Sequence, residues 1–307
     1  MMSIWQHLLL FVIGLVLLVK GSDYLVDGAS CLAMGLGVSS MVIGLTIVAY
    51  GTSLPEFAVS FVASLEGIDD IALGNVIGSN IADICLALGL GAVIRPLKVH
   101  ISVVKREMLI MLGAALLMTF VLLDGVIDRT DGVILLIGFV AYLTFFVHEA
   151  FQANKTGTAN QHAPFWRNAL MVVGGLVAVA VGARLLVDSS VNIARYIGVS
   201  DYVIGLTVVA IGTTLPEVAT STMASYKNQG DIAVGNIIGS VSFQILLVIG
   251  ACAVVLPLVL HTFVDLALMC GVCALILVLF WTGLTLTRRE GVLLLIGYGT
   301  YMVYLFL

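Results

Sequence analysis

The chain has 307 residues, of which 61% are hydrophobic and 10% are charged, and its mean hydropathy is +1.18. A typical soluble domain carries about 25% charged residues, so this composition excludes an ordinary soluble protein and indicates a membrane protein. The net charge is −5 and no basic stripe occurs, which excludes nucleic acid as a partner and leaves the lipid bilayer.

Apolar segments long enough to cross about 30 Å of hydrocarbon recur along the whole chain. Dividing them at polar breaks predicts ten spans, at 3–20, 38–64, 71–94, 107–124, 132–150, 167–187, 200–225, 232–256, 264–284 and 290–306. A polar linker near the middle separates two halves. We therefore expect an all-α polytopic membrane protein of about ten transmembrane helices, with the first half at 1–150, a linker at 151–165 and the second half at 166–307.

The two halves are copies of one pattern. From position 38 to 56 against 199 to 217, 14 of 19 residues are identical, and from 70 to 79 against 231 to 240, 8 of 10 are identical, both at a constant offset of 161. Five spans separate equivalent points, and an odd number places the second copy upside down in the bilayer. The sequence thus predicts two inverted five-helix repeats, an arrangement common among secondary transporters.

The Lys and Arg residues of the loops predict the orientation, because they are enriched on the cytoplasmic side. One side is expected to hold Lys20, Arg95, Lys98, Lys105, Arg106, Lys155, Arg167, Lys227, Arg288 and Arg289, and the other Arg129, Arg184 and Arg195. This bias predicts a multi-pass protein of the plasma membrane with a cytoplasmic linker and both termini outside.

Glu56 and Glu217 are the most informative residues, because each lies within a strongly apolar run. A carboxylate at that depth costs about 2.5 to 3.5 kcal/mol on insertion scales, so two of them require a compensating use. A pair of protonated structural carboxyls is one explanation. Cation binding is the better one.

Each glutamate follows a sequence that breaks helices. Pro55 lacks an N–H and crowds the carbonyl of Gly51, and Pro216 does the same to Gly212, which frees carbonyl oxygens beside the glutamates. Helical spacing places hydroxyls on the same faces. These are the hydroxyls of Thr52 and Ser53 in the first half and of Thr213 and Thr214 in the second.

The following span of each half carries a GN[V/I]IGS motif that ends at Ser79 or Ser240. One turn later a polar residue shares the face of each serine, Asp83 in the first half and Gln244 in the second. The predicted constellation therefore contains three carboxylates, an amide, hydroxyls and carbonyls, without His or Cys. Such hard oxygen ligands suit Ca²⁺ and other hard cations, and three negative charges suit an exchange of cations.

The paired motifs GTSLPE with GNVIGSNIAD and GTTLPE with GNIIGS resemble the two α-repeats of the prokaryotic sodium/calcium exchanger family, within the cation/calcium exchanger superfamily. The resemblance covers essentially the whole chain. It implies a secondary active antiporter that exchanges Ca²⁺ for Na⁺ by alternating access, with the first helix of each half sliding past a core. It implies no cofactor beyond the transported ions and no obligatory protein partner.

The resemblance also implies roles for residues. Glu56 and Glu217 would bind calcium and also sodium, together with Thr52, Thr213 and the backbone carbonyls of Ala49 and Ala210. Ser53, Thr214, Ser79 and Ser240 would complete sodium positions, and Asp83 and Gln244 would occupy the remaining corners. The family pattern often has Asn at the first of these corners and Asp or Asn at the second, so the two corner residues depart from it.

The departure keeps a second coupling ion open. Glutamine at these corners is similar to the proton/calcium branch of the superfamily, so an H⁺/Ca²⁺ or other cation antiporter of the same fold is the alternative. A cation channel is a more distant one, because it would share the oxygen ligands. An enzyme with Ser53 as nucleophile, or with a metal at His148 and Glu149, lacks the required companion residues. We therefore expect no catalytic activity.

Overall fold

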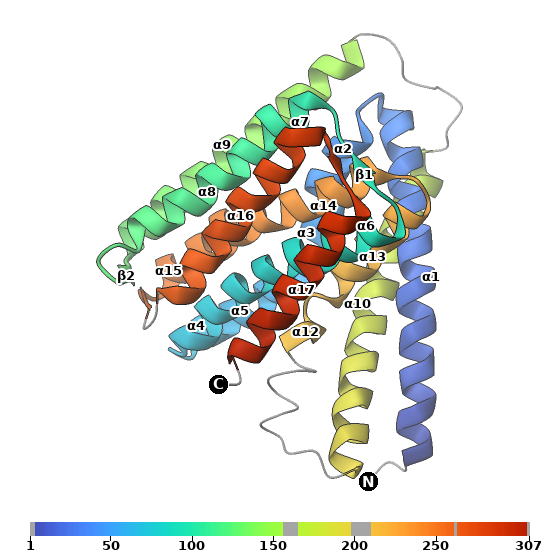
Figure 1. Cartoon of the computed structure of the whole chain (residues 1–307), viewed down its shortest axis with the longest axis horizontal. Helices are drawn as coiled ribbons and strands as arrows, with labels where there is room; N and C mark the ends of the chain where they lie inside the picture. Colours follow the sequence, from blue (N-terminus) through green and yellow to red (C-terminus); the bar gives the residue numbers. More distant parts are fainter. Residues whose placement is uncertain (1–3, 156–164, 198–209, 261–262, 306–307) are drawn as a thin grey trace.

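The computed structural model describes residues 4–155, 165–197, 210–260 and 263–305 (Figure 1). Its elements are α1 (Ile4–Leu36), α2 (Ser40–Ile43), η1 (Gly44–Val48), α3 (Ala49–Thr52), α4 (Leu54–Leu65), α5 (Asp69–Ala82), η2 (Asp83–Leu88), α6 (Gly89–Ile94), β1 (Leu97–Lys98), α7 (Ile101–Lys105), α8 (Glu107–Val121), β2 (Val126–Ile127), α9 (Arg129–Lys155), α10 (Phe165–Tyr196), α12 (Ala210–Gly212), α13 (Leu215–Tyr226), α14 (Gly230–Phe243), η4 (Gln244–Ile249), α15 (Gly250–Val255), β3 (Leu258–Val259), α16 (Val264–Gly283), β4 (Thr285–Leu286) and α17 (Arg288–Leu305). Segments labelled η are π-helices. The described part of the chain is therefore an all-α protein with four very short strands.

Each of the ten predicted spans has a helical counterpart. In chain order these are α1, α2 to α4, α5 to α6, α8, α9, α10, α12 to α13, α14 to α15, α16 and α17. Within the described residues, six helices are long and apolar enough to cross a membrane, and the bent pair on either side of Ser53 makes a seventh span. The start of the span predicted at 200–225 and most of the predicted linker lie outside the described residues.

The first helix of each half is much longer than predicted. α1 continues 16 residues beyond the expected end at position 20, and α10 continues to Tyr196. The polar residues that suggested an end to the first span are accommodated inside it. Ser22 Oγ donates to the carbonyl of Leu18 at 2.8 Å, and Lys227 Nζ lies 2.5 Å from Asp23 Oδ1 and 2.6 Å from Asp27 Oδ1. Because these groups find partners, the helix does not have to stop there.

α1 and α10 pack against each other along their length and stand beside the rest of the molecule (Figure 1). Their contact is lined by glycines seven residues apart, Gly14 and Gly21 on α1 and Gly175 and Gly182 on α10. A Cβ at Gly175 would lie 2.7 Å from the backbone nitrogen of Leu25, so the missing side chain is what allows the close approach. Glycine seams of this kind let membrane helices pack backbone to backbone.

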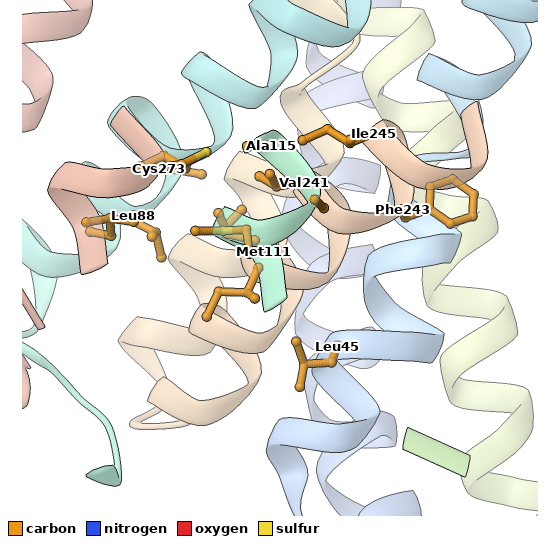
Figure 2. Close-up of a cluster of buried hydrophobic side chains, with 14 of the residues drawn as sticks. Leu45, Leu88, Met111, Ala115, Val241, Phe243, Ile245 and Cys273 are labelled. Atoms are coloured by element: carbon orange, nitrogen blue, oxygen red, sulfur yellow. The ribbon is translucent and has the colours of Figure 1, made fainter. Parts of the chain in front are cut away.

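α14 and its continuation form the centre of the remaining bundle. In an apolar 18-residue stretch of the span Gly230–Val255, 83% of the residues are buried, against 33% in α1. Figure 2 shows Val241, Phe243 and Ile245 of this span among apolar side chains of η1, η2, α8 and α16. The core therefore forms around the helix that follows the second glutamate.

The strands join the two repeats to each other. β1 pairs antiparallel with β4, with Leu97 opposite Leu286, and β2 pairs antiparallel with β3, with Ile127 opposite Leu258. β1 and β3 are equivalent at the repeat offset, so the two small sheets are copies related by the internal symmetry. The structure thus has the two-repeat organisation that the sequence predicts.

Candidate cation-binding site

The chain breaks its helix in front of each glutamate. Ser53 separates α3 from α4 with φ −86° and ψ 8°, and the helices on its two sides differ in direction by 48°. Thr214 separates α12 from α13 with φ −79° and ψ −5°. Pro55 and Pro216 stand in the first turn of the helix that follows each break, where a proline needs no hydrogen-bond partner for its nitrogen.

The glycines of the two breaks face α10. A Cβ at Gly51 would meet the side chain of Leu176 at 2.5 Å, and one at Gly212 would meet Val187 at 2.5 Å. Their small size therefore lets α10 approach both breaks.

Both glutamates are fully buried, and the two repeats exchange hydrogen bonds around them. Ser53 Oγ, from the first break, donates to Glu217 Oε1 at 2.9 Å. Thr52 Oγ1 lies 3.2 Å from Asn236 Oδ1 on α14, and its one proton is shared among this oxygen and the carbonyls of Val48 and Ala49. The first break thus contacts the glutamate and the following helix of the second repeat.

The predicted carbonyl ligand of the first break already accepts local hydrogen bonds. The Ala49 carbonyl accepts from the backbone N–H of Ser53 at 3.0 Å and from Thr52 Oγ1 at 3.2 Å. Its equivalent, Ala210, is the first residue of α12, and Thr213 is half-buried after that helix. A cation at Ala49 would therefore compete with, or share, an oxygen that is engaged in this conformation.

Asp83 and Gln244 are in direct contact. Each is the first residue of a π-helix, η2 or η4. Ser79 Oγ donates to Gln244 Oε1 at 2.6 Å, and Gln244 Nε2 donates to Asp83 Oδ2 at 3.3 Å. The serine of the first repeat and the two corner residues therefore form one buried polar chain, while the Ser240 hydroxyl has no partner within the described residues.

Two asparagines that the sequence analysis did not single out support the glutamate helices. Asn75 Nδ2 donates to the carbonyl of Glu56 at 3.1 Å and to Ser60 Oγ at 2.9 Å. Its equivalent Asn236 donates to Ser221 Oγ at 3.0 Å. The signal was present, because an amide conserved between the two repeats inside an apolar span needs a partner.

Several buried oxygens have no hydrogen-bond partner among the described residues. They are both carboxylate oxygens of Glu56, Oε2 of Glu217, Oδ1 of Asp83 and the hydroxyls of Thr214 and Ser240. Glu56 lies close enough to Glu217 and Asp83 for their charges to repel when ionised, and no described Lys or Arg forms an ion pair with them. A bound cation would both satisfy these oxygens and relieve the repulsion.

The carboxylates do not form a compact cage by themselves. In the part of the chain that the structure describes, no three His, Cys, Asp or Glu side chains converge closely enough to hold one ion. A cation in this region would therefore also need hydroxyl, amide or carbonyl oxygens. That requirement favours a hard cation such as Ca²⁺ or Na⁺ over zinc or copper.

Comparison with known proteins gives one consistent answer. A family model described as sodium/calcium exchanger protein matches residues 6–148 and 167–307. Inner membrane protein YrbG of Escherichia coli is 42% identical over 216 residues, which are 67% of this chain and 66% of that protein. Sodium/calcium exchanger MaX1 of Methanosarcina acetivorans is 33% identical over 299 residues, covering 83% of this chain and 85% of that protein.

A solved structure agrees with these sequences. The sodium-calcium exchanger NCX_Mj, soaked with 2.5 mM Na⁺ and 0.1 mM Ca²⁺, is similar with a TM-score of 0.87 and 36% sequence identity, covering 97% of this chain and 98% of that chain. The family model matches on both sides of the central linker, so both repeats are included. The chain belongs to the sodium/calcium exchanger family.

Proposed function

We propose that the protein is a secondary active antiporter that exchanges Ca²⁺ for Na⁺ across the cell membrane. The observation that carries the proposal is the pair of buried glutamates, Glu56 and Glu217, at matching helix breaks with carboxylate oxygens that lack partners among the described residues. Burial of this kind is expensive unless a cation compensates it. Two such sites in inverted halves fit a transporter better than a structural element.

The proposed ligand roles are those that the family resemblance implies. Glu56 and Glu217 bind calcium and, in its absence, sodium. The hydroxyls and carbonyls that the sequence singled out supply the remaining ligands: Thr52, Thr213, Ser53, Thr214, Ser79, Ser240, Ala49 and Ala210, with Asp83 and Gln244 at the corners. Several of these oxygens are engaged in hydrogen bonds that ion binding would rearrange, such as that from Ser53 to Glu217.

Alternating access would use the α1 and α10 pair as the moving part. The glycine seam holds these two helices together, and α10 contacts both helix breaks through Leu176 and Val187. A displacement of the pair relative to the core would therefore change the packing at both breaks at once. Because the halves are inverted, exchanging their conformations would expose the site to the other side.

We also propose the domain boundaries and the sidedness. The first five-helix repeat is 1–150, the linker is 151–165 and the second repeat is 166–307. The gap between the two family matches, which end at 148 and resume at 167, supports this division. The Lys and Arg bias of the loops supports a cytoplasmic linker and outside termini.

Proton coupling is the second candidate, because Asp83 and Gln244 depart from the usual corner residues. Asp83 Oδ2 accepts a hydrogen bond from Gln244, whereas Oδ1 has no partner in the described part of the chain. A carboxyl with one free buried oxygen can hold a proton as well as a sodium ion. In a proton-coupled exchanger, Asp83 would be the residue that carries the proton.

The experiment is uptake of radioactive calcium into proteoliposomes that contain the purified full-length protein. Vesicles loaded with sodium and diluted into sodium-free buffer are compared with vesicles loaded with choline and with vesicles carrying a pH gradient. Uptake that depends on the sodium gradient supports the proposal. Uptake driven by the pH gradient alone would assign the protein to proton coupling, and uptake with neither gradient would indicate a channel.

A matched variant tests whether the site carries the transport. Glu107 is also a buried carboxyl, but it lies on α8 and is paired with Arg106 at 2.7 Å. Glu107→Gln should keep sodium-driven uptake, whereas Glu56→Gln and Glu217→Gln should lose it. Equal loss in all three variants would mean that burial of a carboxyl, and not its position, explains the effect.

A further inference from the structure

A cavity of about 400 Å³ lies at one end of the bundle, away from the glutamates. It is formed between the connection from α6 to β1 and the start of α14. Arg95 and Lys98 line one side, and Gln229, Gly230 and Asp231 line the other. Neither Arg95 nor Lys98 forms an ion pair within the described residues, so two positive charges face the cavity against one carboxylate.

The other repeat contains the equivalent of this place, a corner between a short strand and the start of a helix, and there a side chain occupies it. We call the corner lined by Arg95 and Lys98 the basic corner. At the offset of 161, Gly230 corresponds to Asp69 and Lys98 corresponds to Val259. In that other corner, Asp69 Oδ2 accepts a hydrogen bond from the backbone N–H of Val259 at 3.2 Å. A carboxylate of the chain itself therefore occupies the corner and satisfies a strand amide.

The basic corner has the same backbone but lacks this carboxylate. The strand geometry matches, because Val99 N–H donates to Leu284 and its equivalent Leu260 N–H donates to Gly125, both at 2.9 Å. Strand amides alternate in direction, so the N–H of Lys98 points out of its sheet as that of Val259 does. A Cβ at Gly230 would lie 3.8 Å from the Lys98 carbonyl, which places the start of α14 beside this strand.

The charged residues also differ between the two corners. Arg95 corresponds to Leu256, and the second cation of the pocket replaces a valine. Asp231 corresponds to Asp70, so the pocket carboxylate belongs to the frame that both repeats share and not to this difference. Relative to the equivalent corner, this one lacks the built-in anion, carries two additional cations and contains a cavity.

We propose that this pocket binds a phosphate-bearing anion from outside the chain. One phosphate oxygen takes the place of the Asp69 carboxylate and accepts the hydrogen bond of the Lys98 N–H, while the side chains of Arg95 and Lys98 neutralise its charge. Charge-assisted hydrogen bonds of this type are the strong ones, and arginine is especially suited to phosphate. The ligand is either the headgroup of an anionic lipid or free phosphate. A lipid headgroup is within reach because the pocket lies at the ends of membrane-spanning helices.

Two variants of the full-length protein test the pocket. Gly230→Asp restores the carboxylate of the other repeat and should fill the site from within. Arg95→Gln combined with Lys98→Gln removes the charges but keeps the cavity. Arg289→Gln, on the exposed face of α17, is the matched control because it removes a basic residue from the same predicted side of the membrane.

Two readouts separate the possible sources of the anion. The protein is reconstituted in phosphatidylcholine vesicles with or without phosphatidylglycerol, and the lipid retained after purification is measured by native mass spectrometry. Inorganic phosphate is titrated separately against chloride at equal ionic strength, with the thermal unfolding midpoint as the signal. Retained phosphatidylglycerol identifies a lipid headgroup, and a phosphate-dependent rise of the midpoint without lipid retention identifies free phosphate.

The proposal expects either signal to weaken by about tenfold or more in both pocket variants, since each loses charge-assisted contacts or gains a competing carboxylate. The signal should persist in Arg289→Gln. Absence of both signals in the wild type would overturn the proposal, and so would binding that is unchanged in Gly230→Asp and in the double variant. Neither readout depends on transport, so this test is independent of the calcium assignment.

Discussion

The helix breaks in the two repeats are alike, whereas the polar residues of the helix that follows each break, Asp83 and Gln244, differ. Glu56 and Glu217 are identical in type, are both fully buried and follow the same Leu-Pro pair. The first residue of η2 is Asp83, and that of η4 is Gln244. The repeats thus keep a carboxylate at one equivalent position and place a carboxylate opposite an amide at the other.

This difference separates two tasks within one site. Functions that must be the same from both sides of the membrane, such as holding the divalent ion, require equivalent ligands in the inverted halves. The choice of coupling ion depends on the total charge and can be set by an asymmetric pair. We therefore propose that the symmetric glutamates bind calcium and that the asymmetric pair, Asp83 and Gln244, sets the coupling ion.

Neutralising one glutamate at a time should have the largest effect. Glu56→Gln and Glu217→Gln should each reduce sodium-driven calcium uptake to the level of protein-free liposomes, because each removes an ionised ligand from the same ion. The measurement is initial calcium flux with the amount of folded protein checked by size-exclusion chromatography. Near-normal flux in one variant would show that the halves are not equivalent.

The corner pair should show a smaller and more selective effect. Asp83→Asn keeps an oxygen for the hydrogen bond from Gln244 but removes the charge. The sodium concentration for half-maximal exchange should rise about tenfold, equivalent to roughly 1.4 kcal/mol, with a smaller change in calcium binding. Unchanged sodium dependence would make Asp83 a structural or proton-binding residue.

The Ser53 hydroxyl distinguishes the two helix breaks. Ser53 donates to Glu217, whereas the equivalent Thr214 hydroxyl has no partner in the described part of the chain. Ser53→Ala should weaken sodium binding about tenfold, because it removes a proposed sodium ligand, and Ser53→Thr should restore most of it. The sodium concentration that displaces half of the bound calcium from the purified variants measures this, and equal values for Ala and Thr would exclude a role for the hydroxyl.

Two neighbouring glycines on α10 provide a stability test with an internal control. A Cβ at Gly175 would meet the backbone of Leu25, whereas one at Gly174 has no described atom within 4 Å. Gly175→Ala should destabilise the protein by about 1 to 3 kcal/mol through overpacking, and Gly174→Ala should be neutral or slightly stabilising. Thermal unfolding of both variants measures this difference. Equal midpoints would show that the glycine contact between α1 and α10 is not tightly packed.

The smallest predicted effect concerns the start of α9. Asp128 and Asp131 form a reciprocal cap, in which Asp131 N–H donates to Asp128 Oδ1 at 2.9 Å and Asp128 N–H donates to Asp131 Oδ2 at 3.0 Å. The hydrogen bond from the Asp131 backbone lowers the pKa of Asp128. Its stabilisation is therefore present above the usual aspartate pKa and is lost as pH falls through the lowered pKa.

Asp128→Asn should accordingly reduce the dependence of stability on pH in the acidic range while leaving neutral-pH transport intact. Thermal unfolding across that range measures the slope. A wild-type slope retained in full would mean that other carboxyl groups cause it.

Much of this fold could be predicted because its pattern is repeated. The constant offset between Glu56 and Glu217 implied the two-repeat organisation, and apolar segments marked the helices. The ends of α1 could not be found in this way, since Asp23 and Asp27 continue the helix by pairing with Lys227, a residue about 200 positions away. Local polarity indicates a helix end only when no distant partner is available.

The candidate site was predicted in composition but not in detail. The direct contact of Gln244 with Asp83 depends on how η2 and η4 are placed, and π-helical turns leave no clear sequence signal. The roles of Asn75 and Asn236 could not be predicted because their partners, the Glu56 carbonyl and Ser221, lie on a neighbouring helix.

Calcium binding to the purified full-length protein, measured by titration calorimetry with and without sodium, tests whether the two glutamates hold the ion. We predict saturable calcium binding that sodium weakens, that is lost in both Glu56→Gln and Glu217→Gln, and that is retained in Glu107→Gln. Calcium binding that survives in both glutamate variants, or that sodium does not affect in the wild type, would contradict it.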